Sequence, residues 1–273
     1  MAALRVAGLR AMGEASEFMV RAARLPGLTL VAANTRRQFA RHSHAVYGIG
    51  VMDAGGQTSA SGRGVVQAVR GEVITVNPGE VHDGVPMSGE KRCWRMLYLD
   101  AALWSEERSS PEWTAPVLRD NRVAALCNAL FGRALRDDDV LEQEALLVAL
   151  LRCAPSTSTP TAPARLSATA PQLQRARERL ADHGQALPSL GELARDAGLS
   201  RYQFLRAFTV ALGLPPHAWA LQQRVAQAEV QLASGQPLVD VALGAGFADQ
   251  SHMTRAFRRF RGYTPGQYAQ AHR

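Results

Sequence analysis

One helix-turn-helix pattern occurs twice near the C-terminus of the chain, between Leu190 and Tyr268. A shift of 48 positions aligns the first helix and the turn of the two copies, and a shift of 49 aligns the second helix, so the second turn has one extra residue. Each first helix is expected to end near Gly198 or Gly246, because glycine readily adopts the left-handed conformation that ends a helix. A single match would leave a plain helical bundle as an equal alternative, whereas the duplicate favours two helix-turn-helix units.

Capping signals indicate where the helices of this region begin. In a capping box, a Ser or Thr and a Glu or Gln three residues later satisfy each other's backbone amides. The pairs are Ser189 with Glu192, Ser200 with Gln203, and Thr264 with Gln267. Residues 216–234 are expected to form one connecting helix of about 30 Å, at about 1.5 Å per residue. Major-groove faces on one side of B-DNA recur about every 34 Å, so this helix would place two recognition helices in successive grooves.

These segments resemble the AraC/XylS family of bacterial transcription regulators. The matching text is LGELARDAGLSRYQFLRAF, then RVAQAEVQLASG, then PLVDVALGAGFADQSHMTRAFRRFRGYTPGQY. The resemblance covers about the last hundred residues and is most specific around the repeated RAF and the TP pair. It implies a unit with two DNA-reading heads joined by one long helix. Double-stranded promoter DNA is the implied partner, and RNA polymerase is a further candidate partner.

The resemblance places the second helix of each copy in the major groove. In the first copy, residues 201–212, it directs three side chains toward the bases, namely Tyr202, Leu205 and Arg206. Phe204 and Phe208 are expected to lie in the core. Leu205 departs from the family, in which this position is often polar, and an apolar side chain can contact only a thymine methyl group.

In the second copy the resemblance implies four groove-facing side chains, namely Gln250, Ser251, Thr254 and Arg255. Arg255 would bind guanine through two hydrogen bonds, and Gln250 would bind adenine. Phosphate contacts, which position a protein without reading sequence, are expected from Arg201, Arg258, Arg259 and Arg261. A solvated surface charge is the alternative for every arginine. For Arg206 and Arg255, the repeated Arg-Ala-Phe could instead tie the helix to its own unit.

Residues 28–99 consist of short apolar or alternating runs separated by turn residues, a pattern typical of β-strands. We expect strands at Leu28–Ala33, Tyr47–Met52, Val65–Val69, Val73–Val76 and Trp94–Leu99. Many short strands at this spacing predict a sandwich or a barrel. Residues 1–24 carry no strong pattern and are expected to form a short helix or an arm.

Two fragments of this region resemble the motifs of the cupin barrel, the usual sensory domain of the family named above. They are Arg41-His42-Ser43-His44, and Gly71 followed by Pro78-Gly79-Glu80-Val81-His82. Metal-binding cupins have a glutamate soon after His-x-His, and none follows His44 here. We therefore predict an effector-binding site containing His42, His44 and His82, with no metal or other cofactor. A three-imidazole zinc or iron site and structural or surface histidines stay open as alternatives.

Residues 116–153 show a helical period on either side of the Asp137-Asp138-Asp139 cluster, which predicts a helical hairpin. Its leucine-rich second half offers more apolar surface than one contact requires, so a homodimer is expected, as the resemblance also implies. Residues 154–171 contain Pro, Ser, Thr and Ala with almost no large side chain, which predicts a flexible linker. The expected domains are therefore 1–153 for sensing and dimerisation and 172–273 for DNA binding.

The composition agrees with a globular protein that binds a polyanion. The 273 residues are 47% hydrophobic and carry a net charge of +7, and residues 172–273 contain 12 arginines against 7 acidic residues. The few cysteines are widely spaced, which excludes a Cys-x-x-Cys metal site and predicts buried thiols in a reducing compartment. We find no transmembrane run, and Arg5 and Arg10 interrupt a secretory signal. A cytoplasmic protein without membrane contact is expected.

The sequence thus predicts an α+β multidomain protein with an N-terminal cupin-like β-barrel, a helical hairpin and a C-terminal all-α double helix-turn-helix domain. The predicted function is that of a sequence-specific transcription regulator, not an enzyme, controlled by an unknown small-molecule effector. Activation and repression both stay open. The alternative function is a metal-dependent cupin enzyme fused to a DNA-binding tail.

Overall fold

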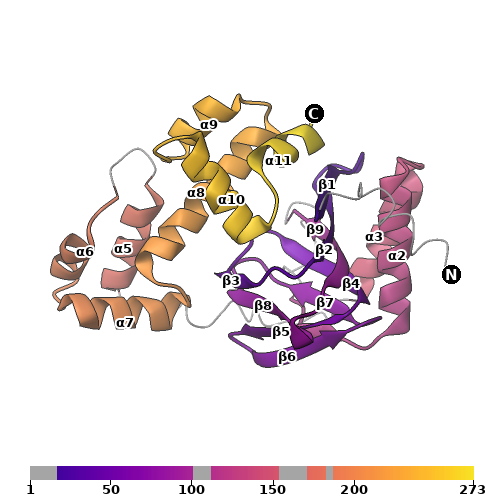
Figure 1. The fold of residues 1–273 in the computed structure, drawn as a ribbon, viewed down its shortest axis with the longest axis horizontal. Coiled ribbons are helices and arrows are strands. Elements are labelled where there is room, and N and C mark those ends of the chain that lie inside the picture. Colours follow the sequence, from indigo (N-terminus) through magenta and orange to yellow (C-terminus); the bar gives the residue numbers. More distant parts are fainter. Residues whose placement is uncertain (1–16, 101–111, 154–170, 183–186) are drawn as a thin grey trace. The chain divides into compact units, whose positions relative to one another are not determined.

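The computed structural model describes residues 17–100, 112–153, 171–182 and 187–273. The chain divides into two compact units, Met1–Pro160 and Thr161–Arg273 (Figure 1). The first unit contains antiparallel strands and a helical hairpin, and the second contains helices. These features confirm the predicted α+β fold class. Residues 154–170 of the predicted linker lie outside the described residues.

Two antiparallel sheets form the first unit. The larger sheet has the order β1-β2-β9-β4-β7-β10, and the smaller sheet has the order β3-β8-β5-β6. The strands of the larger sheet are β1 (Phe18–Ala22), β2 (Leu28–Thr35), β4 (Tyr47–Ala54), β7 (Val73–Val76), β9 (Arg92–Leu99) and β10 (Val117–Leu118). The strands of the smaller sheet are β3 (Phe39–His42), β5 (Gly56–Ser61), β6 (Gly64–Val69) and β8 (His82–Pro86). Each of the five predicted strands is present.

Two sequence-based expectations for this unit are wrong. Within residues 1–24, where a short helix or an arm is expected, Phe18–Ala22 forms strand β1, which pairs with β2. Val117, which fits the apolar stripe of the first hairpin helix, lies instead in β10 and pairs with Ile74 of β7. Val117 receives its hydrogen-bond partner from a strand far earlier in the chain, whereas β1 forms a hairpin with the next strand, β2.

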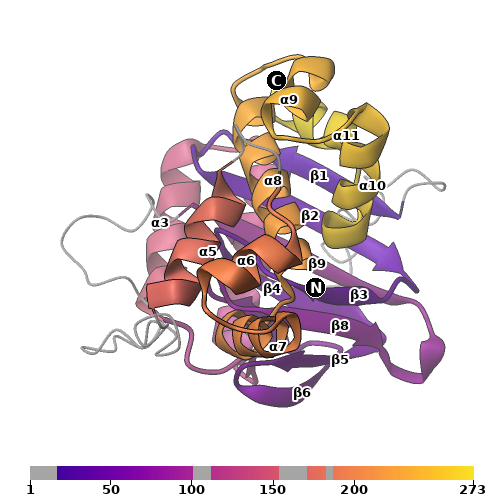
Figure 2. The same cartoon turned by 90° about the vertical axis from the view of Figure 1, so that its left-hand side faces the viewer.

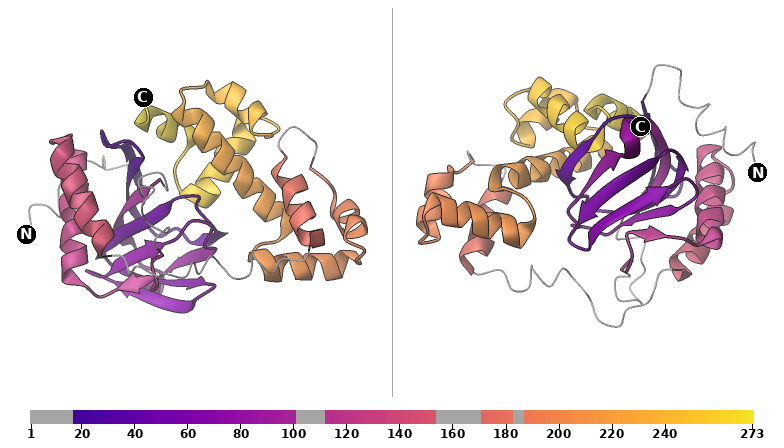
Figure 3. Two further views of the ribbon diagram at one scale, coloured as in Figure 1. Left: turned by 180° about the vertical axis from the view of Figure 1, so that it is seen from behind. Right: turned by 60° about the horizontal axis from the view of Figure 1, so that its bottom comes forward.

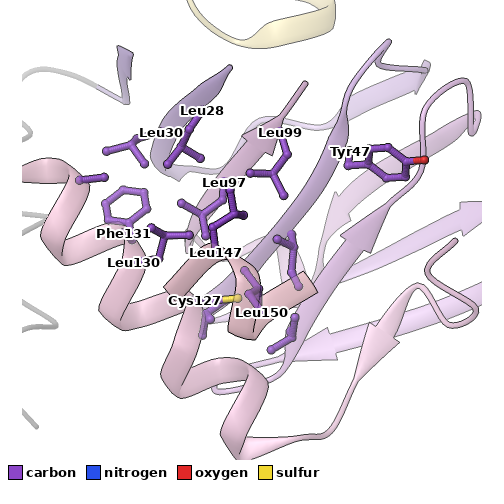
Figure 4. Packing of buried hydrophobic residues seen from close by; sticks show 14 of the residues in the cluster. Leu28, Leu30, Tyr47, Leu97, Leu99, Cys127, Leu130, Phe131, Leu147 and Leu150 are labelled. Carbon is purple, nitrogen blue, oxygen red and sulfur yellow. The ribbon is translucent and has the colours of Figure 1, made fainter. Parts of the chain in front are cut away.

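The larger sheet has a different layer on each face. On one face, its apolar residues pack against the hairpin of α2 (Asn121–Leu135) and α3 (Val140–Arg152) (Figure 4). The buried residues labelled there are Leu28, Leu30, Tyr47, Leu97, Leu99, Cys127, Leu130, Phe131, Leu147 and Leu150. On the other face, Arg92 of β9 reaches Gln57 and Gly84 of the smaller sheet. Successive side chains of β9 point to opposite faces of the sheet, so this strand contacts both layers.

The hairpin itself confirms the helical period of residues 116–153, and Figure 3 shows it beside the sheets. Asp120 begins α2 by accepting hydrogen bonds from the amides of Arg122 and Val123. Asp139 begins α3 by accepting one from the amide of Leu141. Carboxylates at these two N-termini satisfy amides that a helix leaves without an internal partner.

A long helix organises the second unit (Figure 2). Its helices are α5 (Pro171–Ala181), α6 (Leu190–Asp196), α7 (Arg201–Leu212), α8 (Pro216–Ala233), α9 (Leu238–Gly244), α10 (Gln250–Arg261) and α11 (Pro265–Ala271). One helix-turn-helix, α6–α7, lies near the start of α8, and the other, α9–α10, lies near its end. Within the described residues, no helix is long and apolar enough to cross a membrane.

The local signals of the repeat are all present in this unit. The three predicted capping boxes form at Ser189, Ser200 and Thr264. Gly198 and Gly246 have φ values of +67° and +78°, the left-handed conformation predicted for the two turns. The turn before α7 contains residues 197–200 and the turn before α10 contains residues 245–249, which confirms the extra residue in the second copy.

A buried ion pair connects the larger sheet to the hairpin. Two nitrogens of Arg95 on β9 lie 2.6 and 2.7 Å from the carboxylate of Asp53 on β4, and Nη2 also lies 2.7 Å from Oδ1 of Asn128 on α2. The Arg95 and Asp53 side chains are only 6% and 8% exposed. The guanidinium also lies 5.3 Å from the ring centroid of Phe131. Removal of one partner would leave the other charge buried and unpaired.

We therefore predict that Asp53→Ala lowers the free energy of unfolding by about 3 kcal/mol, the cost of breaking a buried ion pair. The measurement is urea unfolding of the full chain, followed by circular dichroism. The control is Glu90→Ala, which breaks an exposed pair with Arg36 whose side chains are 73% and 64% exposed. It should change stability by less than about 0.5 kcal/mol. Equal effects of the two substitutions would contradict the importance of burial.

The three cysteines differ in exposure, which corrects the expectation that all are buried thiols. Cys127 is buried, Cys93 is half-buried and Cys153 is exposed at the end of α3. Burial raises the pKa of the Cys127 thiol to about 12. Burial and the charge of Asp53 also raise the pKa of Cys93. Because the thiolate is the reactive species, the three side chains should differ in reactivity.

The native protein is expected to show one fast thiol reaction with an aromatic disulfide reagent at neutral pH, at Cys153. Cys127 should react only after unfolding, because its thiol is both buried and protonated. The variants Cys153→Ser and Cys127→Ser, followed by absorbance, assign the phases. A fast phase that persists in Cys153→Ser would show that the assignment is incorrect.

Candidate functional site

His42 and His82 face each other across two paired strands of the smaller sheet. His42 ends β3 and His82 begins β8, and the antiparallel register sets them directly opposite each other. Opposed residues of such a pair have Cβ atoms about 5 Å apart. The two imidazole ring centroids are 4.4 Å apart. Strand register alone thus places these side chains together.

His44 reaches the same position from the loop after β3. Its backbone carbonyl accepts a hydrogen bond of 2.8 Å from the amide of Gly79. Gly79 has a φ of +74°, in the region that favours glycine, and its turn leads to His82. The His44 ring centroid lies 5.0 Å from that of His42 and 5.3 Å from that of His82. This backbone contact therefore joins the two histidine motifs.

These three side chains form what we call the histidine cluster. One potential ligand nitrogen from each lies within 4.8 Å of the other two. Nδ1 of His42 lies 2.8 Å from the carbonyl oxygen of Ala40, and Nδ1 of His82 lies 3.0 Å from that of Glu80. A carbonyl oxygen only accepts, so both Nδ1 atoms carry the proton and each neutral ring has its lone pair on Nε2. The cluster can accept hydrogen bonds from a polar ligand or coordinate a metal ion.

The structure thus brings together all three predicted effector-binding residues, and their role in binding an effector stays a prediction. His42 and His44 are 5% and 8% exposed, and His82 is partly buried. Purely surface positions are therefore wrong for His42 and His44. The cluster contains imidazoles alone, with no carboxylate or thiolate among the described residues that form it.

Tyr98 lies beside the histidine cluster, and the sequence analysis does not single it out. Its ring centroid is 5.0 Å from that of His44. Tyr98 pairs with Gly48, and the next pair on the same face of the sheet joins Met96 to Gly50. A Cβ at Gly48 would lie 3.2 Å from Cε1 of Tyr98, and one at Gly50 would lie 2.5 Å from Sδ of Met96. The Gly-x-Gly spacing within an apolar strand is the signal that marks this close approach.

Arg92 places a second functional group between the sheets. It is 1% exposed, and its guanidinium donates hydrogen bonds to Gln57 Oε1 and to the carbonyl oxygens of Arg37 and Gly84. Its Cζ lies 4.7 Å from the ring centroid of Trp94. Burial lowers the pKa of Arg92 to about 10, so it stays charged at neutral pH. These hydrogen-bond acceptors are neutral, so none of them cancels the charge of Arg92.

The second unit presents a polar face on the first recognition helix, α7. Tyr202 is 74% exposed, and Arg201 and Arg206 are exposed as well. The Arg201 guanidinium lies against α6, because a Cβ at Gly191 would be 3.1 Å from its Nη2. Leu205 is only partly exposed. Of the three side chains that the resemblance directs to the groove, Tyr202 and Arg206 are exposed and Leu205 is partly buried.

On the second recognition helix, α10, the base-reading candidates Gln250, Ser251 and Arg255 are exposed. Thr254 is partly buried, and its hydroxyl donates a hydrogen bond of 2.8 Å to the carbonyl oxygen of Gln250. Its methyl group and an oxygen lone pair remain for contact. Burial, followed by the charges of Arg255 and Arg224, lowers the pKa of His252. His252 is therefore neutral at neutral pH and adds no charge to this face.

The phosphate candidates on α10 divide into two groups. Arg258 and Arg259 are exposed, and Cζ of Arg259 lies 5.2 Å from the ring centroid of Phe260. Arg261 is instead 7% exposed and bound to Glu229 of α8 through contacts of 2.7 and 2.9 Å. Its expected role as a phosphate contact is wrong, because both the burial and the ion pair commit it to the interior.

The predicted core positions of the two recognition helices are confirmed. Phe204 and Phe208 on α7, and Met253 and Phe257 on α10, are fully buried. In contrast, the described residues give Arg206 and Arg255 no hydrogen bond or ion pair. The buried phenylalanine of each Arg-Ala-Phe packs its helix against its own unit, and the role of the arginine stays a prediction.

Comparison with known proteins assigns both units to one family. A family model described as an AraC-like ligand binding domain matches residues 25–151, and one described as a helix-turn-helix domain matches residues 193–271. The chain belongs to the AraC family of transcription regulators. AraC-family relatives include the virulence regulon transcriptional activator VirF of Yersinia enterocolitica, 37% identical over 79 residues. This match spans 29% of each of the two chains.

A longer match extends over both units. The HTH-type transcriptional regulator YbfI of Bacillus subtilis, described as uncharacterized, is 27% identical over 225 residues, which is 80% of this chain and 82% of YbfI. Among solved structures, an apo form of a ToxT variant from Vibrio cholerae has a TM-score of 0.50 and 10% identity, and covers 90% of this chain and 98% of ToxT. At that identity the likeness shows the fold alone.

Proposed function

We propose that this AraC-family protein is a sequence-specific DNA-binding transcription regulator controlled by a small-molecule effector. One observation carries the proposal, namely the exposed faces of the recognition helices α7 and α10, which belong to two helix-turn-helix motifs joined by α8. The 18 residues of α8 span about 27 Å at about 1.5 Å per residue. Successive major-groove faces are about 34 Å apart. A duplex site of two successive grooves therefore fits the two recognition helices.

The exposed side chains divide into two roles. Base reading is assigned to Tyr202, Leu205, Arg206, Gln250, Ser251, Thr254 and Arg255. Among these, Arg206 and Arg255 can each donate two hydrogen bonds to guanine, and Leu205 is limited to an apolar contact. Phosphate contacts are assigned to Arg201, Arg258 and Arg259, whose charges add affinity through counterion release without reading the sequence.

The first unit supplies the control. The effector binds at the histidine cluster, where His42, His44 and His82 offer ring nitrogens between the sheets. It changes DNA binding only if it binds one arrangement of the protein more tightly than another. A homodimer fits the exposed apolar side chains on α3, where Leu141 and Val148 are 71% and 48% exposed. The dimer interface would then include this helix.

The outcome we propose is activation, with RNA polymerase as a further partner, because VirF is named a transcriptional activator. A regulator of this kind works in the cytoplasm without membrane contact and catalyses no reaction. The named relatives are transcriptional regulators, which favours this function over a cupin enzyme fused to a DNA-binding tail.

Arg255→Ala is expected to reduce the preference for the specific site over random DNA by about 1–3 kcal/mol, because it removes a bidentate guanine contact. Affinity for random DNA should change much less. The measurement is fluorescence anisotropy with the region upstream of the protein's own gene and with random DNA, at several salt concentrations. Equal losses on both DNAs would assign Arg255 to the phosphate backbone.

Arg258→Ala is the matched control on the same helix. It should weaken binding to both DNAs by a similar factor and reduce the slope of log affinity against log salt by about 1. Arg261→Ala is unsuitable as a control because it breaks the buried pair with Glu229. If wild-type binding is equal for both DNAs and disappears at physiological salt, the proposed reading function is incorrect.

Effector control is tested with His82→Ala. A small molecule that raises the unfolding temperature of the wild-type protein should also change its affinity for the specific DNA. The variant should lose both responses while it keeps effector-free DNA binding. The control, His217→Ala, changes an exposed histidine at the start of α8 and should keep both responses. Retention of both responses by His82→Ala would place the effector elsewhere.

A further inference from the structure

We propose that His42, His44 and His82 bind one divalent transition-metal ion. The inference goes beyond the proposed function, and it concerns the first unit alone. It rests on three features of the histidine cluster: the convergence of its ring nitrogens, the tautomers set by two backbone carbonyls, and the absence of anionic donors from the group.

Convergence is the first feature. The three potential ligand nitrogens lie within 4.8 Å of one another. Around a tetrahedral zinc ion with bonds of about 2.05 Å, ligand nitrogens are about 3.3 Å apart. The rings would rotate on metal binding to close the difference. The fold produces this arrangement in two ways. The strand register sets His42 opposite His82, and the backbone contact with Gly79 brings His44 to the same place.

The tautomers are the second feature. The carbonyls of Ala40 and Glu80 hold the Nδ1 protons of His42 and His82, so the basic nitrogen of each neutral ring is Nε2. Metal-binding histidines commonly donate their other ring N–H to a carbonyl in this way, which orients the ring and makes the ligand nitrogen more basic. His42 and His82 thus share one tautomer, which is the tautomer of two ligands that bind an ion through Nε2.

Donor chemistry is the third feature, and it selects the class of metal. Imidazole is a ligand suited to zinc, copper, nickel and iron, whereas calcium and magnesium require oxygen ligands. Three neutral histidines leave at least one coordination position for water or a ligand. Because the donors of the cluster are neutral imidazoles in the part of the chain that the structure describes, this position favours an anion.

Cobalt(II) titration tests the site, because this ion substitutes for zinc and absorbs visible light. The full chain, without a polyhistidine tag, is stripped with chelator and dialysed. One equivalent should bind and produce an absorption typical of four or five ligands, and zinc should displace it. His42→Gln and His82→Gln should each weaken binding more than about 100-fold, since loss of an orienting partner alone costs roughly 10- to 100-fold.

Two controls separate this site from other ligands. His217→Gln removes an exposed histidine of α8, and Cys153→Ser removes the exposed thiol, and both should bind cobalt as the wild type does. An absence of visible absorption in the wild type overturns the proposal. Equal cobalt affinity in His42→Gln and the wild type also overturns it.

A measurement on the wild type covers the case in which the variants fail to fold. X-ray absorption of the zinc-loaded protein should show three imidazole ligands. A spectrum with sulfur ligands, or with fewer than two imidazoles, overturns the proposal. Neither experiment uses DNA, so the metal site and the proposed regulatory function can fail separately.

Discussion

The alternation of side chains along strand β9 is the constraint on which the first unit depends. Leu97 and Leu99 point toward the hairpin and belong to its core. Arg95, on the same face, makes the buried ion pair with Asp53. Residues of the opposite parity, such as Arg92 and Tyr98, contact the smaller sheet or the histidine cluster. A shift of one residue in register would exchange these faces, so the core and the site are specified together.

A comparable constraint acts in the second unit, where α8 holds the second recognition helix through charged groups. Glu229 of α8 binds Arg261 at the end of α10, and the Tyr263 hydroxyl lies 3.4 Å from the same carboxylate. At the other end of the motif, the guanidinium of Arg224 lies against the turn, because a Cβ at Gly246 would be 3.1 Å from its Nε. Burial lowers the pKa of Arg224. These contacts at two separate points define the direction of α10 relative to α8, which determines where Arg255 can reach.

The sequence predicts the second unit better than the first for a physical reason. Helix boundaries depend on neighbours within a few residues. The capping box of Ser200 with Gln203 and the turn at Gly246 can therefore be recognised without knowledge of the fold. Strands β5 and β8 have few apolar residues, and they pair with each other although they are far apart in the chain. The histidines are found through motifs, but Tyr98 is not, because its position depends on the cross-strand pair with Gly48. Arg261 is misassigned because its partner, Glu229, lies 32 residues earlier in the chain.

The location of the histidine cluster suggests how a bound ligand can act on the first unit. His42 and His82 belong to β3 and β8, and the pairing of these strands is irregular between Phe39 and His42. An interrupted ladder has fewer backbone hydrogen bonds to resist local opening, so these strands should separate at a lower free energy than β4 and β9, which pair along most of their length. A ligand that bridges His42 and His82 binds only the closed pairing, and therefore stabilises it in proportion to its concentration and affinity. The site thus lies where binding has the largest effect on local structure, whereas the same histidines on β9 would rigidify a strand that is already fixed on both sides.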